Sequence, residues 1–179
     1  MSAARSRGNR ARLFFALWPD DSVRDALTVA ALEARAQTGG RAIAPEKIHL
    51  TLFFVGSVDR AHLPALEAIG ASIRSSAFEL MLDTLGYWRH NRIVWCGTTR
   101  CPAPLALLEA ELRSALESVG VRSEKRPYIP HITLVRDAAC TPREVAFAPC
   151  AWHARDFVLV ESQPSGGAMR YVVRAKWPL

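Results

Sequence analysis

Two stretches decide how this chain folds: residues 48–55 read IHLTLFFV, and residues 130–136 read PHITLVR. Both are apolar runs, the first followed by Gly and the second opened by Pro, and short runs of this kind are typical of buried β-strands. Both also contain the pattern His-x-Thr. Because side chains in a strand alternate between two faces, residues two apart share one face. Each stretch therefore predicts a strand that presents an imidazole beside a hydroxyl group.

The two motifs divide the chain symmetrically. His49 and Thr51 fall in the first third of the 179 residues, and His131 and Thr133 fall in the last third. No other similarity between the two halves is evident in the sequence. A motif repeated at this distance favours a duplicated, bilobal fold, in which the two strands face one cleft.

Helices and further strands surround the motif strands. We expect a helix between the candidate capping residues Asp20 to Ser22 and the glycine pair at positions 39 and 40, and helices at residues 59–75 and 104–119, because apolar residues recur there at spacings of three and four. We expect strands at residues 13–18, 48–55, 78–85, 92–97, 132–135, 157–160 and 171–175. This order, without a glycine-rich phosphate loop or a Pro/Gly/Ser linker, predicts a single α+β domain.

The composition is that of a globular protein. Half of the residues are hydrophobic and 22% are charged, which excludes the disordered and fibrous classes. The start, MSAARSRGNRAR, is basic and leads into a short apolar strand rather than into a signal-peptide core. We therefore expect a flexible basic tail over residues 1–11, one domain over residues 12–179, no membrane span and a cytoplasmic location.

The net charge and the cysteines indicate the kind of partner and the redox state of the thiols. A net charge of +6, most of it from Arg, favours an anionic partner because a guanidinium group binds phosphate through two parallel hydrogen bonds. A solvated basic surface is the alternative interpretation. The four Cys form neither a CxxC pair nor the dense spacing of a disulfide scaffold, so we expect reduced thiols.

Two imidazoles across a small anion are suited to phosphodiester chemistry. One neutral ring can take a proton from an attacking water, while the other, protonated ring gives a proton to the leaving alkoxide. Hydroxyl groups beside them can stabilise the negative charge that develops on the phosphate oxygens. We therefore interpret His49, Thr51, His131 and Thr133 as catalytic residues.

Other interpretations of the motifs carry less weight. The histidines could be ordinary strand residues, and Thr is a good strand former. A catalytic metal usually takes three protein ligands, and neither motif carries a second His or a carboxylate on the same face. Nothing in the sequence places a Cys beside a base or a helix N-terminus, as a thiol nucleophile requires. We expect no metal and no cofactor.

Five stretches resemble, in order and spacing, a family of known proteins: RLFFALWP, APEKIHLTLFFVGSV, LDTLGYWRHNRIVW, RPYIPHITLVR and YVVRAKWPL. The chain resembles, from about Arg12 to Leu179, the bacterial and archaeal RNA 2′,3′-cyclic phosphodiesterases, also called 2′-5′ RNA ligases or LigT-like proteins. These belong to the two-histidine phosphoesterase superfamily. The paired His-x-Thr motifs are specific to that superfamily, and the flanking residues narrow the likeness to this branch.

The resemblance implies both a fold and an activity. The fold would be α+β and bilobal, with two antiparallel sheets facing a central cleft and helices on the outside. The activity would be metal-independent hydrolysis of 2′,3′-cyclic phosphate ends of RNA to 2′-phosphates, with a weak reverse ligation that forms 2′-5′ linkages. By the same likeness, His49 would protonate the departing 3′ oxygen and His131 would activate water.

The family also has an Arg after the second motif that is linked to substrate phosphate, and Arg136 matches it. Strict alternation puts Arg136 on the face opposite His131. Either the strand ends or bulges before Arg136, or this side chain is structural. Tyr128 and Phe53 could stack on a base, although core packing is the simpler role for both. We assign Trp18, Trp88, Trp95, Trp152 and Trp177 to the core or the surface.

Two rival functions remain at this point. One is a phosphodiesterase for a small cyclic phosphate, such as a nucleotide or an ADP-ribose derivative. The other is a module that binds RNA ends without catalysis, although binding alone would favour Arg or Lys over two titrating imidazoles. The expected partner is RNA or a nucleotide with a cyclic phosphate end, and we expect a monomer.

Overall fold

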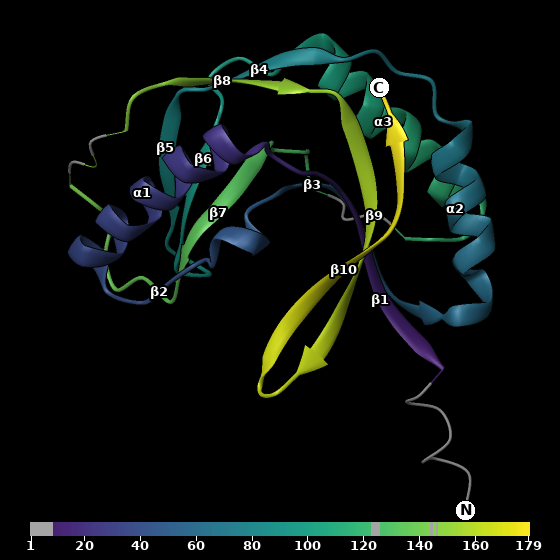
Figure 1. Ribbon diagram of the computed structural model, residues 1–179, viewed down its shortest axis with the longest axis horizontal. Helices are drawn as coiled ribbons and strands as arrows, with labels where there is room; N and C mark the ends of the chain where they lie inside the picture. Colours follow the sequence, from purple (N-terminus) through teal and green to yellow (C-terminus); the bar gives the residue numbers. More distant parts are fainter. Residues whose placement is uncertain (1–8, 123–125, 144, 146) are drawn as a thin grey trace, which may run out of the picture.

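A computed structural model describes residues 9–122, 126–143, 145 and 147–179. The protein is α+β, as the sequence predicts, with two lobes that form an arch in Figure 1. The helices are α1 (Asp21–Thr38), α2 (Leu63–Ser72) and α3 (Ala103–Ser118), with 3-10 turns η1 (Pro45–Lys47) and η2 (Arg60–His62). The strands are β1 (Arg10–Leu17), β2 (Arg41–Ala42), β3 (Leu50–Asp59), β4 (Phe78–Leu82), β5 (Thr84–Trp88), β6 (Ile93–Gly97), β7 (His131–Arg136), β8 (Cys150–Ala154), β9 (Asp156–Ser165) and β10 (Ala168–Pro178). Among the described helices, none is both long and apolar enough to cross a membrane.

Two antiparallel sheets of unequal size form the framework. The larger has eight strands in the order β10-β9-β1-β3-β7-β6-β5, with β2 paired to β7, and the smaller consists of β4 and β8. The motif strands β3 and β7 are neighbours in the larger sheet, and their registered contact is the pair Leu50 and Ile132. The two lobes of the larger sheet therefore join where the two motifs meet.

Helix α1 covers the face of β7 that is turned away from the motif side chains. The Asp20 carboxylate accepts a hydrogen bond from the Val23 N–H at 3.0 Å and caps the helix. At the other end Gly39 has a φ of 66°, which an L side chain rarely adopts, and ends the helix. Val23 and the other apolar residues of the stripe lie in the same core cluster as Ile132 and Leu134 of β7.

Several predicted boundaries were wrong. Strand β1 begins at Arg10 and Ala11 is buried, so these two residues belong to the sheet rather than to the predicted tail; residues 1–8 of that tail lie outside the described residues. The strand predicted at 78–85 divides at Asp83 into β4 and β5, which belong to different sheets. The Asp83 carboxylate accepts hydrogen bonds from the Thr99 N–H and hydroxyl group, which hold the chain at this crossing.

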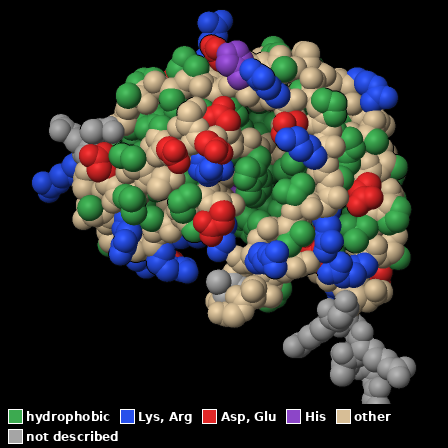
Figure 2. Space-filling view, viewed as in Figure 1, with side chains coloured by type: hydrophobic (Ala, Val, Ile, Leu, Met, Phe, Trp, Pro, Cys, Tyr) green, Lys and Arg blue, Asp and Glu red, His purple; other side chains and the backbone are tan. Residues whose placement is uncertain are grey.

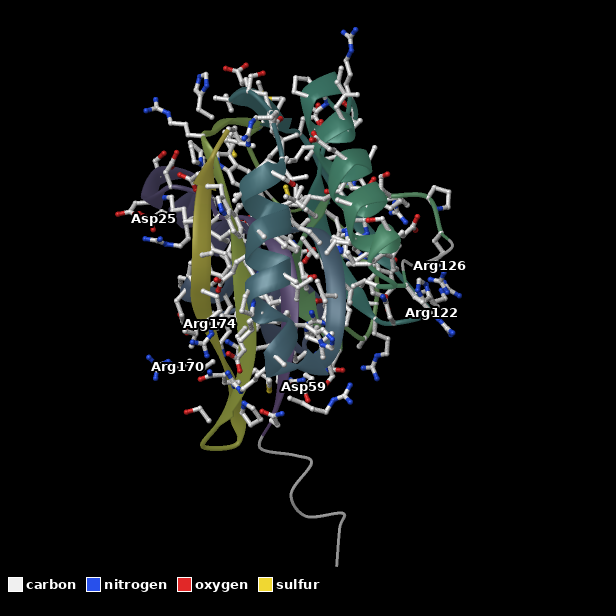
Figure 3. The ribbon with its side chains drawn as sticks, turned by 90° about the vertical axis from the view of Figure 1, so that its right-hand side faces the viewer. Asp25, Asp59, Arg122, Arg126, Arg170 and Arg174 are labelled. Carbon is white, nitrogen blue, oxygen red and sulfur yellow. The ribbon has the colours of Figure 1, made fainter. Side chains whose placement is uncertain are left out.

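A buried carboxylate ties the β9–β10 hairpin to its lobe. Glu161 is 2% exposed and contacts the guanidinium groups of Arg60 and of Arg174, which Figure 3 shows on β10. Burial raises the pKa of Glu161, but hydrogen bonds from both arginines and from Gln163 outweigh burial and bring this pKa below its ordinary value, so the carboxylate is ionised at neutral pH. This ion cluster fixes β10, which carries Tyr171 against the ring of His49.

Candidate active site

The antiparallel pairing of β3 with β7 brings the two motifs together. Leu50 and Ile132, the middle residues of the motifs, are paired and fully buried. In an antiparallel pair, the residue before Leu50 lies opposite the residue after Ile132, and the residue after Leu50 lies opposite the residue before Ile132. These neighbours point to the other face of the sheet, so the histidine of each motif lies opposite the threonine of the other. His49 is thus beside Thr133. The surface is hollowed between the two lobes in Figure 2, with hydrophobic side chains in the hollow.

Both motif histidines are held in the same way. Nδ1 of His49 lies 2.6 Å from the carbonyl oxygen of Lys47, and Nδ1 of His131 lies 2.8 Å from that of Ile129. A carbonyl oxygen can only accept, so Nδ1 carries the hydrogen in each ring. Nε2 is then the nitrogen whose protonation changes, which is what a general acid or base requires.

Aromatic side chains surround the two histidines unequally. The ring of His49 stacks on Trp18 with centroids 5.3 Å apart and planes at 12°, and it also contacts Phe14 at 4.9 Å and Tyr171 at 5.4 Å. The ring of His131 meets the edge of Trp88 at 4.5 Å. Trp18 and Trp88 are therefore part of the site, and their assignment to core or surface was incomplete because a stacking partner brought by another strand leaves no local signal.

Burial of His49 changes its proton affinity. Desolvation among the aromatic rings lowers the pKa of His49 from 6.5 to about 4. The hydrogen bond to the Lys47 carbonyl raises this pKa, whereas the positive charges of Arg136 and His131 lower it further. In the protein without a bound anion, His49 is consequently neutral at pH 7.

A β-bulge decides where Arg136 lies. Thr133 and Val135 pair with successive residues of β6, so Leu134 is an extra residue in β7. Leu134 and Val135 are both buried, so beyond the bulge the alternation of side chains between the two faces is shifted by one residue. Arg136 therefore lies on the same face as Thr133, and its charge acts on His49. Among the described residues, no carboxylate forms an ion pair with Arg136.

The other sequence candidates lie outside the reacting position. Phe53 is buried in the core, so its packing role is confirmed. Tyr128 is half-buried against the core, where its hydroxyl group donates to the Thr51 carbonyl at 3.1 Å and positions β3. Burial raises the pKa of the Cys96 thiol, which makes it a poor nucleophile. Within the described part of the chain, no three His, Cys, Asp or Glu side chains come together as a metal site would need.

The lowered pKa of His49 leads to a testable pH dependence. In ¹⁵N NMR titrations we expect a pKa of about 4 in the anion-free protein, and a higher one in inorganic phosphate because the anion stabilises the imidazolium. Between pH 6.5 and 4 the unfolded chain takes up a proton here that the folded protein does not. The free energy of unfolding should therefore fall as the pH drops through this range. Titration of His49 near 6.5 without anion would contradict the desolvation argument.

Comparison with known proteins places this geometry in a family. A family model described as the 2′-5′ RNA ligase superfamily matches residues 19–162. The RNA 2′,3′-cyclic phosphodiesterase of Escherichia coli (strain K12) is 33% identical over 172 residues, which cover 94% of this chain and 96% of that protein. The protein of the same name from Thermus thermophilus is 31% identical over 180 residues, covering 94% of this chain and 90% of the relative.

Solved structures agree with the sequence comparison. The crystal structure of E. coli LigT complexed with 3′-AMP superimposes with a TM-score of 0.84 at 33% identity, covering 95% of this chain and 98% of the other. The crystal structure of TT0787 of Thermus thermophilus gives a TM-score of 0.81 at 28% identity, covering 94% and 97%. With the family model matching most of its length, this chain belongs to the 2′-5′ RNA ligase superfamily.

Proposed function

We propose that this protein hydrolyses 2′,3′-cyclic phosphate ends of RNA to 2′-phosphates. The observation that carries the proposal is the junction of β3 and β7, where two imidazoles with fixed Nδ1 hydrogens share one face with two threonines. The names of the E. coli and T. thermophilus relatives support this reaction over phosphate binding alone.

In the proposed reaction a water oxygen attacks phosphorus and the bond from phosphorus to the 3′ oxygen breaks. One imidazole takes a proton from the water at Nε2, and the other gives its Nε2 proton to the departing 3′ oxygen. The ring-opened product carries the phosphate on the 2′ oxygen. The two rings finish with their protonation states exchanged, and proton exchange with solvent restores them.

The neighbouring polar groups act on the charge that develops at phosphorus. Thr51 and Thr133 can donate hydrogen bonds to the non-bridging oxygens, and the guanidinium group of Arg136 can neutralise part of their charge. The bulge that turns Arg136 to the histidine face supports its role as the phosphate-binding residue.

The family likeness makes His49 the proton donor and His131 the base. With a pKa of about 4 in the free protein, His49 must then gain its proton as the cyclic phosphate arrives, because the anion offsets the positive charge of Arg136. A neutral His49 before binding also avoids an unpaired imidazolium among three aromatic rings.

Several related statements stay predictions. The same acid-base pair would allow a weak reverse reaction that forms 2′-5′ linkages, since each step runs through the same transition state in both directions. A nucleotide cyclic phosphate would serve as a smaller substrate. Catalysis without metal or cofactor, a monomeric state and a cytoplasmic location are likewise predicted from the sequence.

The proposal is tested with an oligoribonucleotide that ends in a 2′,3′-cyclic phosphate. We expect turnover by the purified protein in excess EDTA, and ³¹P NMR should identify a 2′-phosphate product. Loss of turnover in EDTA with recovery on added Zn²⁺ or Mn²⁺ would show that a metal takes part. A 3′-phosphate product would keep the acid-base pair but reverse the orientation of the nucleotide. An inactive protein that still binds the oligonucleotide would indicate a binding module.

A further inference from the structure

A strip of side chains leads away from His49 along the cleft face of β1. Phe14, whose ring contacts His49 at 4.9 Å, belongs to a small apolar cluster separate from the main core. Arg12 is two residues away in the same strand and therefore shares its face. Phe54 of β3 is the direct cross-strand partner of Phe14 and also lies on this face. The strip thus continues from the catalytic histidine through Phe14 to Phe54 and Arg12.

The far end of this strip is open to solvent. Phe54 is 43% exposed, unlike Phe14, which is buried. The guanidinium carbon of Arg12 lies 5.0 Å from the centroid of the Phe54 ring, an arrangement typical of a cation–π contact. Within the described residues, Arg12 forms no ion pair with a carboxylate. In Figure 2, Lys and Arg side chains gather over the outer part of β1 and beside the β9–β10 hairpin.

The exposed pair has the chemistry of a surface for single-stranded nucleic acid. Base rings stack on aromatic faces and on guanidinium planes with little sequence preference, while the cation also attracts the phosphate backbone. Phe14 lies between the catalytic histidine and this exposed pair. A longer RNA whose last nucleotide occupies the site has to leave along one wall of the cleft.

We propose that Arg12 and Phe54 bind the single-stranded RNA segment that precedes the cyclic phosphate end. The proposal rests on the proposed function, because that function places the end of an RNA between the motifs. It gives the enzyme a preference for an oligonucleotide over a mononucleotide. Positive charge, an exposed ring and continuity with His49 favour RNA as the occupant over another protein.

The test compares two substrates and two variants. Phe54→Ala and Arg12→Gln should each raise KM for a four-nucleotide RNA ending in a 2′,3′-cyclic phosphate about tenfold, within the range for loss of one stacked base. Neither variant should change kcat/KM for a mononucleotide 2′,3′-cyclic phosphate. Arg12→Gln should also reduce the slope of log KM against log salt for the oligonucleotide by about 0.7, as expected for one lost phosphate contact.

Matched controls come from α1, which covers the opposite face of the sheet. Arg35→Gln removes the same charge from an exposed position, and Leu32→Ala removes an exposed apolar side chain that is 53% accessible. Both should behave as the unmodified protein with both substrates. A loss that occurs in Arg12→Gln or Phe54→Ala but not in these controls is therefore due to where the side chain lies and not to the kind of side chain that was removed.

The outcomes separate this inference from the proposed function. If the unmodified protein hydrolyses both substrates and the two variants match it on the oligonucleotide, the strip does not bind RNA. Equal losses on both substrates would show a structural role and also overturn the inference. Binding of an oligonucleotide with a 2′-phosphate end, measured by fluorescence anisotropy, tests the strip even when turnover is absent. Unchanged affinity in both variants would then exclude it.

Discussion

His49→Ala and His131→Ala are each expected to lower kcat on a 2′,3′-cyclic phosphate by roughly 10² to 10⁴, the usual range for loss of a general acid or base. The physical reason is that each ring supplies one proton transfer that water performs poorly. The effects should not add in the double variant, because either loss already interrupts the paired transfer. Thr51→Ala and Thr133→Ala should cost less, because each removes one hydrogen bond and leaves the proton path intact.

His153 supplies a matched control for these variants. It is an exposed histidine of β8 that belongs to neither motif and lies 3.3 Å from a carboxylate oxygen of Glu79. His153→Ala should keep normal turnover. Thermal unfolding should confirm that all variants fold. Near-normal turnover in either motif variant would remove that histidine from the reaction.

Arg136→Ala is expected to lower kcat/KM by about 10² to 10³, the loss seen when one preorganised donor to a developing anion is removed. Arg136→Lys should recover part of this loss, because an ammonium group restores the charge but not the two parallel hydrogen bonds. Arg35→Ala, on the outer face of α1, is the control for removing an exposed arginine.

The same variant has a second readout that does not depend on turnover. Because the charge of Arg136 lowers the pKa of His49, Arg136→Ala should move the NMR-determined pKa of His49 above 4, and Arg136→Lys should largely keep it low. A normal kcat/KM in Arg136→Ala would show that the bulge presents this arginine for another purpose. An unchanged pKa of His49 would show that the two groups do not interact.

Local periodicity and residue chemistry were enough to predict several features of the fold and of the site. Alternation within each motif strand fixed His49 and Thr51 on one face, as it did for His131 and Thr133. The apolar stripe, the candidate capping residues Asp20 to Ser22 and the glycine pair at 39 and 40 likewise predict a helix where α1 lies. These features depend on neighbours a few residues away, so the linear pattern contains them.

The joining of the two halves into one site depends on tertiary contacts. The pairing of Leu50 with Ile132 joins residues far apart in the chain, and no local pattern specifies that register. The bulge at Leu134 reverses the predicted face of Arg136, because an extra residue in one strand is defined only by the strand beside it. The proton affinity of His49 depends on aromatic rings from the end of β1 and from β10, which lie far from His49 in the sequence. The desolvation that lowers its pKa therefore arises only in the folded chain.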